Sequence, residues 1–487
     1  MYRFETNLRN SNPHAFVGEV EGAKYILSSI TLPTGDAYGK FLLSGMAFRS
    51  RNPVNVGLIL LTLLICIYLY NKQSTNLRSP ILQFSVDGQK PSTDILQSLS
   101  LTDDQCAATF PGLTKEIDDA VARGPFPLKR QPDHHTGLVQ GRIKNGKVYI
   151  ISADPKPSRN MLQERISVLH QLHRAVITSP SPLPNTIFSL NVLDTPMNNS
   201  WAFSRSNNPQ IKDGNYWVMP HFSFWSWPIS FIGTIDEALS KIERIEKNTH
   251  WTEKIDKAVW RGTGWFNTVG NKDLRPNLIL KGKEKEWADI EALEWNTNGE
   301  SAENAIGIED FCKYKYIIYT EGITYSGRLL FHQACASIIL TPPPMYLLHN
   351  THFMRPIFST SFFPEHESAP NTYDNWSTRW PQTYGPSEAN IIFVKPDWSD
   401  LEETIMYLRN HPEIATGIAE RQRQLFTRYL SPASEACYWR ALIRGWSKVA
   451  EPYYEDDGWG SWDAEGLENG EGMRWENFNL LGEIPRN

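Results

Sequence analysis

The segment 312–340, CKYKYIIYTEGITYSGRLLFHQACASIIL, constrains the fold more than any other part of the chain. It begins with alternating aromatic and β-branched residues at 314–319 and breaks at Glu321-Gly322. It resumes with helical spacing over 328–336 and ends in the apolar run 337–340. This order predicts a strand, a loop, a helix and a second strand.

The loop and helix start in this segment predict an anion-binding site. Ser326 is expected to cap the helix N-terminus, so that free N–H groups and the positive dipole end face the mouth of the sheet. Arg328 in the first turn would add a guanidinium that suits a phosphate. The segment alone leaves open a second interpretation, in which this is an ordinary strand–helix junction with a solvated arginine.

Size and charge narrow the class of protein. A chain of 487 residues is long enough for two core-forming domains with appendages. The formal net charge of −6 and the lack of a long basic run argue against a nucleic-acid partner. The 17 Trp, 19 Tyr and 22 Phe indicate a folded chain, and they suit sugar stacking and ordinary core packing equally well.

Residues 54–70, VNVGLILLTLLICIYLY, carry no charge and are flanked by basic residues. They span roughly 25 Å as a helix, which predicts an uncleaved transmembrane signal anchor; a buried core helix is the alternative. Residues 1–53 would then be a short cytosolic tail and the polar residues 71–105 a stem. This type II arrangement puts the bulk of the chain in the lumen of the Golgi or the endoplasmic reticulum.

Four cysteines lie outside the apolar span, namely Cys106, Cys312, Cys335 and Cys437. In an oxidising lumen they allow three disulfide pairings. Their spacing does not match a metal site, because no CxxC motif or histidine cluster accompanies them.

Two halves of the chain each alternate strands with helices. The first contains a βαβ unit, with a strand in 144–155, a helix over 161–177 and a strand that ends at Asp194. Such a unit implies a parallel sheet with its functional edge at the carboxyl ends of the strands. The segment 214–231 holds seven aromatic residues and two prolines, and is predicted to be a cleft-lining loop.

A domain boundary is expected near residue 246. Two doubly wound α/β domains would then cover 106–245 and 246–430, followed by a terminal helix at 431–451. The Gly-, acid- and Trp-rich tail 452–487 is expected to be loosely ordered.

Six pieces occur in a fixed order: NVLDTP, FSFWSWP, AVWRGTG, CKYKYIIYTEG, TYSGRL and ACYW. Together they resemble glycosyltransferase family 90, which includes protein O-glucosyltransferases and fungal capsule-associated proteins, and the fungal-type members are closer. The resemblance covers roughly residues 106–450. It implies a GT-B-like architecture, with two Rossmann-like domains facing a cleft and the C-terminal domain holding the nucleotide sugar.

The resemblance also implies roles for individual residues. Asp194 of NVLDTP corresponds to the catalytic base of an inverting transfer. Phe224, Trp225 and Trp227 could form an acceptor-side platform or belong to the core. The donor-binding positions correspond to Thr263, Arg275, Thr324, Ser326, Gly327 and Arg328.

The family disulfide corresponds to Cys312–Cys335, which leaves Cys106 to pair with Cys437 and to hold the helix 431–451 against the first domain. Two N-glycosylation sequons occur, at Asn198 and Asn375. Asn375 is the candidate for modification, whereas a glycan on Asn198 would crowd Asp194.

The expected function is therefore inverting transfer of glucose or xylose from a UDP-sugar to a hydroxyl of a glycan or glycoprotein. No cofactor is expected, and no divalent metal, because the luminal sequence lacks a convincing D-x-D motif. The alternative is a catalytically inactive carbohydrate-binding or scaffold protein with the same fold.

Overall fold

The computed structural model describes residues 16–20, 23–27, 91–131, 136–208, 214–266, 271–296, 301–363, 380–452, 459, 465, 470–482 and 484. The chain divides into two compact units, Met1–Gln83 and Phe84–Asn487. In the first unit, strands β1 (Phe16–Val20) and β2 (Ala23–Leu27) pair antiparallel. The predicted anchor 54–70 and Asn375 lie outside the described residues, so both stay predictions. None of the described helices is long and apolar enough to cross a membrane.

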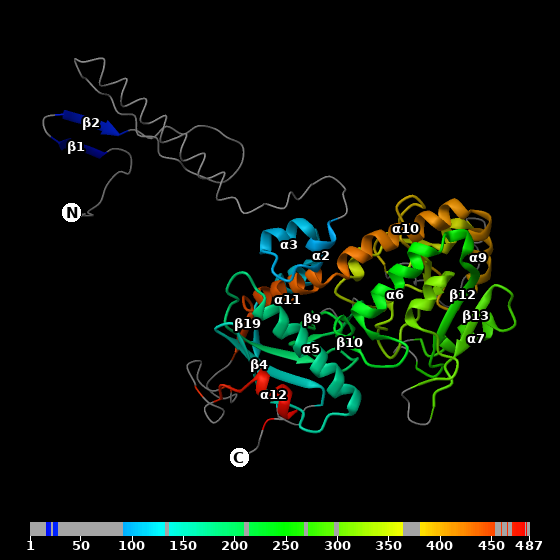
Figure 1. The fold of residues 1–487 in the computed structure, drawn as a ribbon, viewed down its shortest axis with the longest axis horizontal. Coiled ribbons are helices and arrows are strands. Elements are labelled where there is room, and N and C mark those ends of the chain that lie inside the picture. Colours follow the sequence, from blue (N-terminus) through cyan, green and yellow to red (C-terminus); the bar gives the residue numbers. More distant parts are fainter. Residues whose placement is uncertain are drawn as a thin grey trace. The chain divides into compact units, whose positions relative to one another are not determined.

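The second unit contains two six-stranded sheets, and the first of them is mixed (Figure 1). Its strands are β4 (Leu138–Lys144), β5 (Lys147–Ala153), β6 (Thr186–Asn191), β7 (Ser200–Ala202), β9 (Tyr216–Val218) and β20 (Met473–Arg474), in the order β20-β5-β4-β6-β7-β9. Helix α5 (Arg159–Ile177) connects β5 to β6, as predicted. The two strands are not neighbours, however, because β4 lies between them and is antiparallel to both.

Strand β4 was missed because the predicted strand 144–155 included the turn at Asn145-Gly146 and no strand was expected before it. Asn145 and Gly146 both adopt positive φ, 51° and 70°, and connect β4 to β5. Asn-Gly with two left-handed residues is the preferred two-residue hairpin turn. The prediction of a parallel first sheet is therefore confirmed only in part: β6, β7 and β9 are parallel, whereas β4 and β20 pair antiparallel with their neighbours.

The second sheet is parallel throughout. Its strands are β12 (Ile255–Gly262), β13 (Ala288–Ala292), β14 (Tyr314–Ile318), β15 (Ile338–Thr341), β17 (Pro356–Phe358) and β18 (Ile391–Phe393), in the order β13-β12-β14-β15-β18-β17. Its helices include α7 (Leu274–Gly282), α9 (Leu401–Asn410) and α10 (Pro412–Tyr429). Helix α6 (Ile235–Asn248) spans the boundary expected near residue 246. Parallel strands with crossover helices are consistent with a Rossmann-like α/β fold.

Short elements complete the second unit. They are α4 (Lys115–Val121), β3 (Phe126–Leu128), β8 (Arg205–Ser206), β10 (Ser226–Trp227), β11 (Gly233–Thr234), α8 (Leu329–His332), β16 (Tyr346–Leu347) and β19 (Ala450–Pro452). Strand β19 pairs with β3, and β16 pairs with β8.

Helix α11 (Pro432–Trp446) returns to the first sheet and packs against α5 (Figure 1). Trp446 is fully buried, and its ring lies 5.4 Å from that of Trp201 and 5.2 Å from that of Trp217, between centroids. The disulfide Cys106–Cys437 connects α11 to α3 (Asp103–Thr109). The expected terminal helix is thus present and packs on the first sheet.

The predicted stem and the predicted tail both contain packed structure. In the stem, α2 (Thr93–Gln97) contacts α11 and buries Ile95. In the tail, β20 pairs with β5 and α12 (Trp475–Leu481) buries Trp475 and Phe478. Trp459 is fully buried, and its indole N–H donates to the carbonyl of Leu128. For these tail residues the prediction of loose order was wrong, because their few large apolar side chains find partners in the body of the unit.

The segment 312–340 folds as β14, a loop, α8 and β15, but the helix is shorter than predicted. Helix α8 covers four residues where nine were expected, and its N-cap is Arg328 with no side-chain cap hydrogen bond. The prediction of Ser326 as N-cap was therefore wrong. A single helical turn offers no aligned dipole, so any anion site here must depend on side chains and loop N–H groups.

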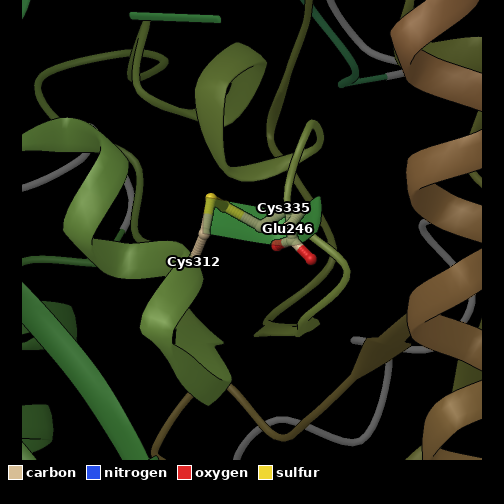
Figure 2. A group of neighbouring side chains, drawn as sticks. All are labelled: Glu246, Cys312 and Cys335. Carbon is tan, nitrogen blue, oxygen red and sulfur yellow. A yellow bond between two sulfur atoms is a disulfide. The ribbon is translucent and has the colours of Figure 1, made fainter. Parts of the chain in front are cut away.

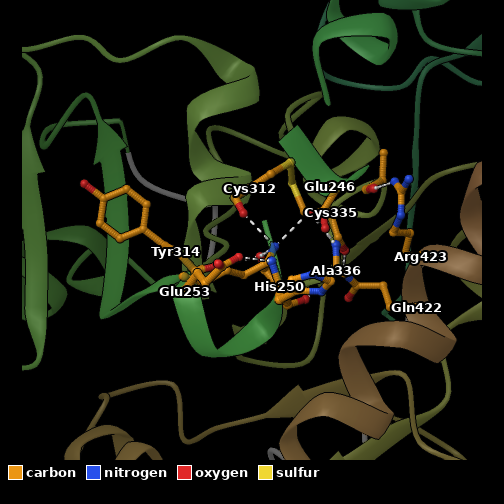
Figure 3. Close-up of polar contacts among 12 residues, drawn as sticks. Glu246, His250, Glu253, Cys312, Tyr314, Cys335, Ala336, Gln422 and Arg423 are labelled. Atoms are coloured by element: carbon orange, nitrogen blue, oxygen red, sulfur yellow. Dashed lines mark hydrogen bonds and ion pairs between the residues drawn. A yellow bond between two sulfur atoms is a disulfide. The ribbon is translucent and has the colours of Figure 1, made fainter. Parts of the chain in front are cut away.

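A buried polar cluster lies beneath this segment. The disulfide Cys312–Cys335 lies beside the carboxylate of Glu246 (Figure 2). Lys254 Nζ donates to Glu246 Oε1 at 2.8 Å and to the carbonyl of Cys312 at 2.6 Å, and the N–H of Ala336 donates to the same carboxylate oxygen at 2.8 Å (Figure 3). The Lys254 and Glu246 side chains are 1% and 3% exposed, so each charge depends on the other.

Replacing Lys254 by Met should leave Glu246 as an unpaired buried charge. We expect the free energy of unfolding to fall by about 3–5 kcal/mol, and the double variant Lys254→Met/Glu246→Leu to recover part of that loss. Urea titration of the full chain measures both. The control is Lys285→Met, which breaks a half-exposed ion pair with Glu402 and should cost at most about 1 kcal/mol. Equal losses in the two single variants would contradict this account.

Candidate active site

A cavity of about 970 Å³ brings together segments that are far apart in the sequence. The first turns of α5, the loop after β6 and the segment after β9 line one part of it. The loops after β12 and β14 line the other. Among the residues predicted to bind or react, the lining includes Asp194, Trp227, Thr263, Arg275, Ser326, Gly327 and Arg328.

Strand adjacency explains why the two loops of the second sheet meet. Strands β12 and β14 are parallel neighbours, with Val259 opposite Ile317, so their carboxyl ends lie at the same edge of the sheet. Gly262 ends β12 and Thr263 follows it, and the loop 320–328 follows β14. Ligands bind at this edge in open α/β sheets.

Two arginines converge in this part of the cavity, of which Arg275 is buried and Arg328 is partly buried. Arg275 Nη1 donates to the carbonyl of Thr263 at 2.8 Å and Nε donates to that of Glu321 at 3.1 Å. Arg328 Nη1 donates to the carbonyl of Arg261. Burial lowers the pKa of Arg275 to about 9, with the charge of Arg328 as the second cause, and burial lowers the pKa of Arg328 to about 10. Within the described part of the chain, neither arginine forms an ion pair with a carboxylate.

Arg261, in the same region, differs from these two arginines because it forms ion pairs within the protein. Its Nη2 lies 2.7 Å from Asp289 Oδ1, and its Nε lies 3.5 Å from Glu291 Oε2. Its charge is therefore neutralised within the protein. Among the described residues, the guanidiniums of Arg275 and Arg328 contact carbonyl oxygens and, for Arg275, the ring of Trp260, but no carboxylate. Such a pair is a strong site for an anion with several oxygens.

Asp194 lies in the loop after β6 and faces the cavity. Its side chain is accessible to solvent there, yet the surrounding protein raises the pKa of its carboxyl by desolvation. The carbonyl of Asp194 accepts a hydrogen bond of 2.9 Å from Thr324 Oγ1. Thr324 is itself buried and does not line the cavity. The hydrogen bond from Thr324 to Asp194 instead joins the loop after β14 to the loop after β6.

Glu164 is a cavity residue that the sequence interpretation missed. It lies on α5, on the polar face that also presents Arg159, Asn160 and Gln163 to the cavity. Burial, followed by the negative charge of Asp194, raises the pKa of Glu164 to about 8. The polar residues at spacing i, i+1, i+4 and i+5 at the start of this helix were the available signal.

The three aromatics expected on the acceptor side have different environments. Trp227 lines the cavity. Trp225 instead stacks on His170, with ring centroids 4.8 Å apart, and Arg174 lies 5.0 Å from its ring centroid. Phe224 is buried against His349. The expected cleft-lining segment 214–231 therefore contributes to the cavity mainly through its second half, from His221 to Phe231.

Potential metal ligands gather at one place in the described residues, where atoms of Glu246, Cys312 and Cys335 lie within 4.8 Å of one another (Figure 2). These residues do not offer a metal site in this state, because the two sulfurs are bonded to each other and Glu246 is paired with Lys254. This cluster is also distinct from the residues that line the cavity.

A family model for glycosyl transferase family 90 matches residues 122–367, about half of the chain, and these residues contribute every lining segment of the cavity. The chain therefore belongs to glycosyl transferase family 90. This confirms the resemblance on which the predicted site residues depend.

Individual relatives are distant. The chain is 25% identical over 286 residues to human protein O-glucosyltransferase 1, and 23% identical over 291 residues to the O-glucosyltransferase rumi homolog of Aedes aegypti. Each match covers 55% of this chain and 63% of the relative, which is less than two thirds of its length. A longer match, 22% identical over 442 residues, links it to zebrafish (Danio rerio) protein O-glucosyltransferase 2 and covers 86% of this chain and 76% of the relative.

The raised pKa of Glu164 has a testable consequence for stability. Between pH 4.5 and about 8 the folded chain retains a proton that the unfolded chain releases, so the free energy of unfolding falls as pH rises through this window. Glu164→Gln should remove that fall, with stability close to the wild type at pH 5 and higher by about 1–3 kcal/mol at pH 9. Urea unfolding at both pH values measures the difference. The exposed Glu420 of α10, changed to Gln, is the control, and an identical pH dependence in all three proteins would contradict the assignment.

Proposed function

We propose that this chain is an inverting glycosyltransferase that transfers glucose or xylose from a UDP-sugar to a hydroxyl of a glycoprotein or glycan in the secretory pathway. The observation that carries the proposal is the convergence of Arg275 and Arg328 in the same cavity as Asp194, with no carboxylate partner for either arginine in the described ranges. Family membership and relatives named protein O-glucosyltransferase support the reaction class.

The two arginines are proposed to bind the diphosphate of the donor. A diphosphate has several oxygens to accept from two guanidiniums, and its charge neutralises the repulsion between them. As the bond to the sugar breaks, negative charge develops on the leaving diphosphate, and fixed guanidiniums stabilise it. Ser326 and Gly327 lie beside Arg328 in the cavity wall and are proposed as further donor contacts.

Asp194 is proposed to be the general base. The oxygen of the acceptor hydroxyl attacks the anomeric carbon, its proton passes to the Asp194 carboxylate, and the electron pair of the broken C–O bond leaves with the diphosphate. A raised carboxylate pKa makes this proton transfer more favourable. Attack from the face opposite the leaving group inverts the anomeric carbon. We propose that the arginines provide the positive charge at the leaving group, and that a divalent ion is not required.

Replacing Arg328 by Ala should weaken UDP binding by about 10- to 100-fold, because charge-assisted hydrogen bonds to phosphate are lost. The unfolding temperature should change little, since the substitution also relieves repulsion with Arg275. Calorimetric titration of UDP into the full chain measures the affinity.

The control for Arg328→Ala is Arg421→Ala. Arg421 of α10 also donates to backbone carbonyls, at 2.9 Å to that of Ala389, but does not line the cavity. UDP should bind equally well to this variant and to the wild type. Unchanged UDP affinity in Arg328→Ala would refute the phosphate role.

Replacing Asp194 by Asn should reduce sugar transfer by at least about 100-fold while UDP affinity is retained. The backbone contact with Thr324 does not involve the carboxylate and should survive. Release of UDP from UDP-glucose or UDP-xylose, with and without acceptor, measures turnover. Asp154→Asn is the matched control, because Asp154 likewise follows a strand of the first sheet, β5, and does not line the cavity. Full activity in Asp194→Asn would exclude this base.

A further inference from the structure

His221 lies in the cavity wall, and neither the phosphate contacts nor the proton transfer proposed above uses it. Its side chain is almost fully buried, at 2% exposed. Its Nδ1 lies 2.7 Å from Ser223 Oγ and accepts the backbone N–H of Ser223 at 3.1 Å. Because Nδ1 is an acceptor, the neutral ring carries its hydrogen on Nε2.

This ring is a neutral hydrogen-bond donor. Burial lowers the pKa of His221 to about 3, with the nearby His349 as the second cause, so the ring is not a third cation beside the arginines. Among the described residues no group accepts a hydrogen bond from Nε2. A donor that the protein leaves without an acceptor is costly when it is shielded from water, and in a cavity wall it is available to an acceptor on a ligand.

The loop after β14 locates His221 relative to the rest of the site. Thr324, in the middle of this loop, holds the carbonyl of Asp194. Arg328, at the end of the loop, carries one of the two guanidiniums. Between them, the His221 ring covers Gly327, where a Cβ would lie 2.3 Å from His221 Cε1. His221 therefore lies along the loop between the proposed base and the proposed diphosphate site.

Aromatic rings surround His221 on the same side of the cavity. Ring centroids lie 3.9 Å away for Phe222, 5.4 Å for Tyr325 and 5.7 Å for Trp227. Phe222 and Trp227 line the cavity and are 5.3 Å apart. Aromatic surface with one fixed polar donor suits a ligand that has apolar C–H faces and hydroxyl acceptors, as a sugar ring does.

We propose that His221, Phe222 and Trp227 form the subsite for the sugar that is transferred. The Nε2–H of His221 donates to a hydroxyl oxygen of that sugar, and the two aromatic rings pack against its C–H groups. This inference rests on the proposed function, because it assumes that a nucleotide sugar occupies the cavity. It makes His221 a residue that selects the donor sugar, whereas the arginines bind the diphosphate that all donors share.

Two substitutions at His221 separate this role from a structural one. In His221→Asn the amide oxygen can replace Nδ1 as acceptor for Ser223, but the donor at Nε2 is lost. In His221→Gln the longer amide can present an N–H near the former Nε2, while the Ser223 contact is lost. His349→Asn is the control, since His349 is also a buried neutral histidine but does not line the cavity.

Affinities of the full-length wild type and variants are measured by calorimetry for UDP, UDP-glucose and UDP-xylose. We expect His221→Asn to weaken binding of the UDP-sugar that the wild type prefers by about three- to ten-fold, with UDP itself unchanged. His221→Gln should retain most of the wild-type preference, and His349→Asn all of it. This pattern supports the sugar subsite.

Two other results overturn the inference and are distinguishable. In the first, His221→Asn lowers the affinities for UDP and for the UDP-sugar equally, or lowers neither, or His221→Gln loses more UDP-sugar affinity than His221→Asn. His221 is then structural, while the proposed function stands. If the wild type binds none of the three nucleotides, the proposed function fails and the sugar subsite fails with it.

Discussion

Two guanidiniums held close together, with no carboxylate partner among the described residues, are the physical constraint on which the site depends. Burial lowers the pKa of Arg275 and of Arg328, and their guanidiniums donate to the backbone carbonyls of Thr263, Glu321 and Arg261. Arg261 lies near the carboxyl end of β12, and Thr263 and Glu321 lie in the loops after β12 and β14. The parallel sheet therefore has to keep the two loops in register, and this is achieved by the direct pairing of the two strands.

A disulfide and a buried ion pair hold the strands on either side of this loop. The disulfide Cys312–Cys335 and the pair Lys254–Glu246 lie together where β14 and β15 begin, with Lys254 bonded to the carbonyl of Cys312 and Glu246 to the N–H of Ala336 (Figure 3). Thr324 then holds the loop to Asp194. A base on one sheet and a charge cluster on another can act on one bond only if such contacts fix their separation.

The sequence predicted what depends on local pattern. The strand at 314–318 follows from the alternation of aromatic and β-branched residues and the strand at 338–341 from an apolar run, and the order of six motifs led to the correct family. The sequence could not predict the length of α8. The chain turns after His332 so that Cys335 reaches its disulfide partner, and this depends on tertiary structure. It missed the hairpin at Asn145-Gly146 and the role of Glu164, whose environment exists only when α5 and Asp194 meet. The burial of Trp459 and Trp475 likewise depends on partners more than 300 residues earlier in the chain.

The central claim is that this cavity binds a nucleoside diphosphate through Arg275 and Arg328 opposite Asp194. A crystal structure of the protein with UDP tests it most directly. The account predicts diphosphate oxygens within about 3.2 Å of both guanidiniums, with the Asp194 carboxylate facing the side of the diphosphate where a sugar would be attached. UDP bound elsewhere, with both guanidiniums free of phosphate contacts, would contradict it.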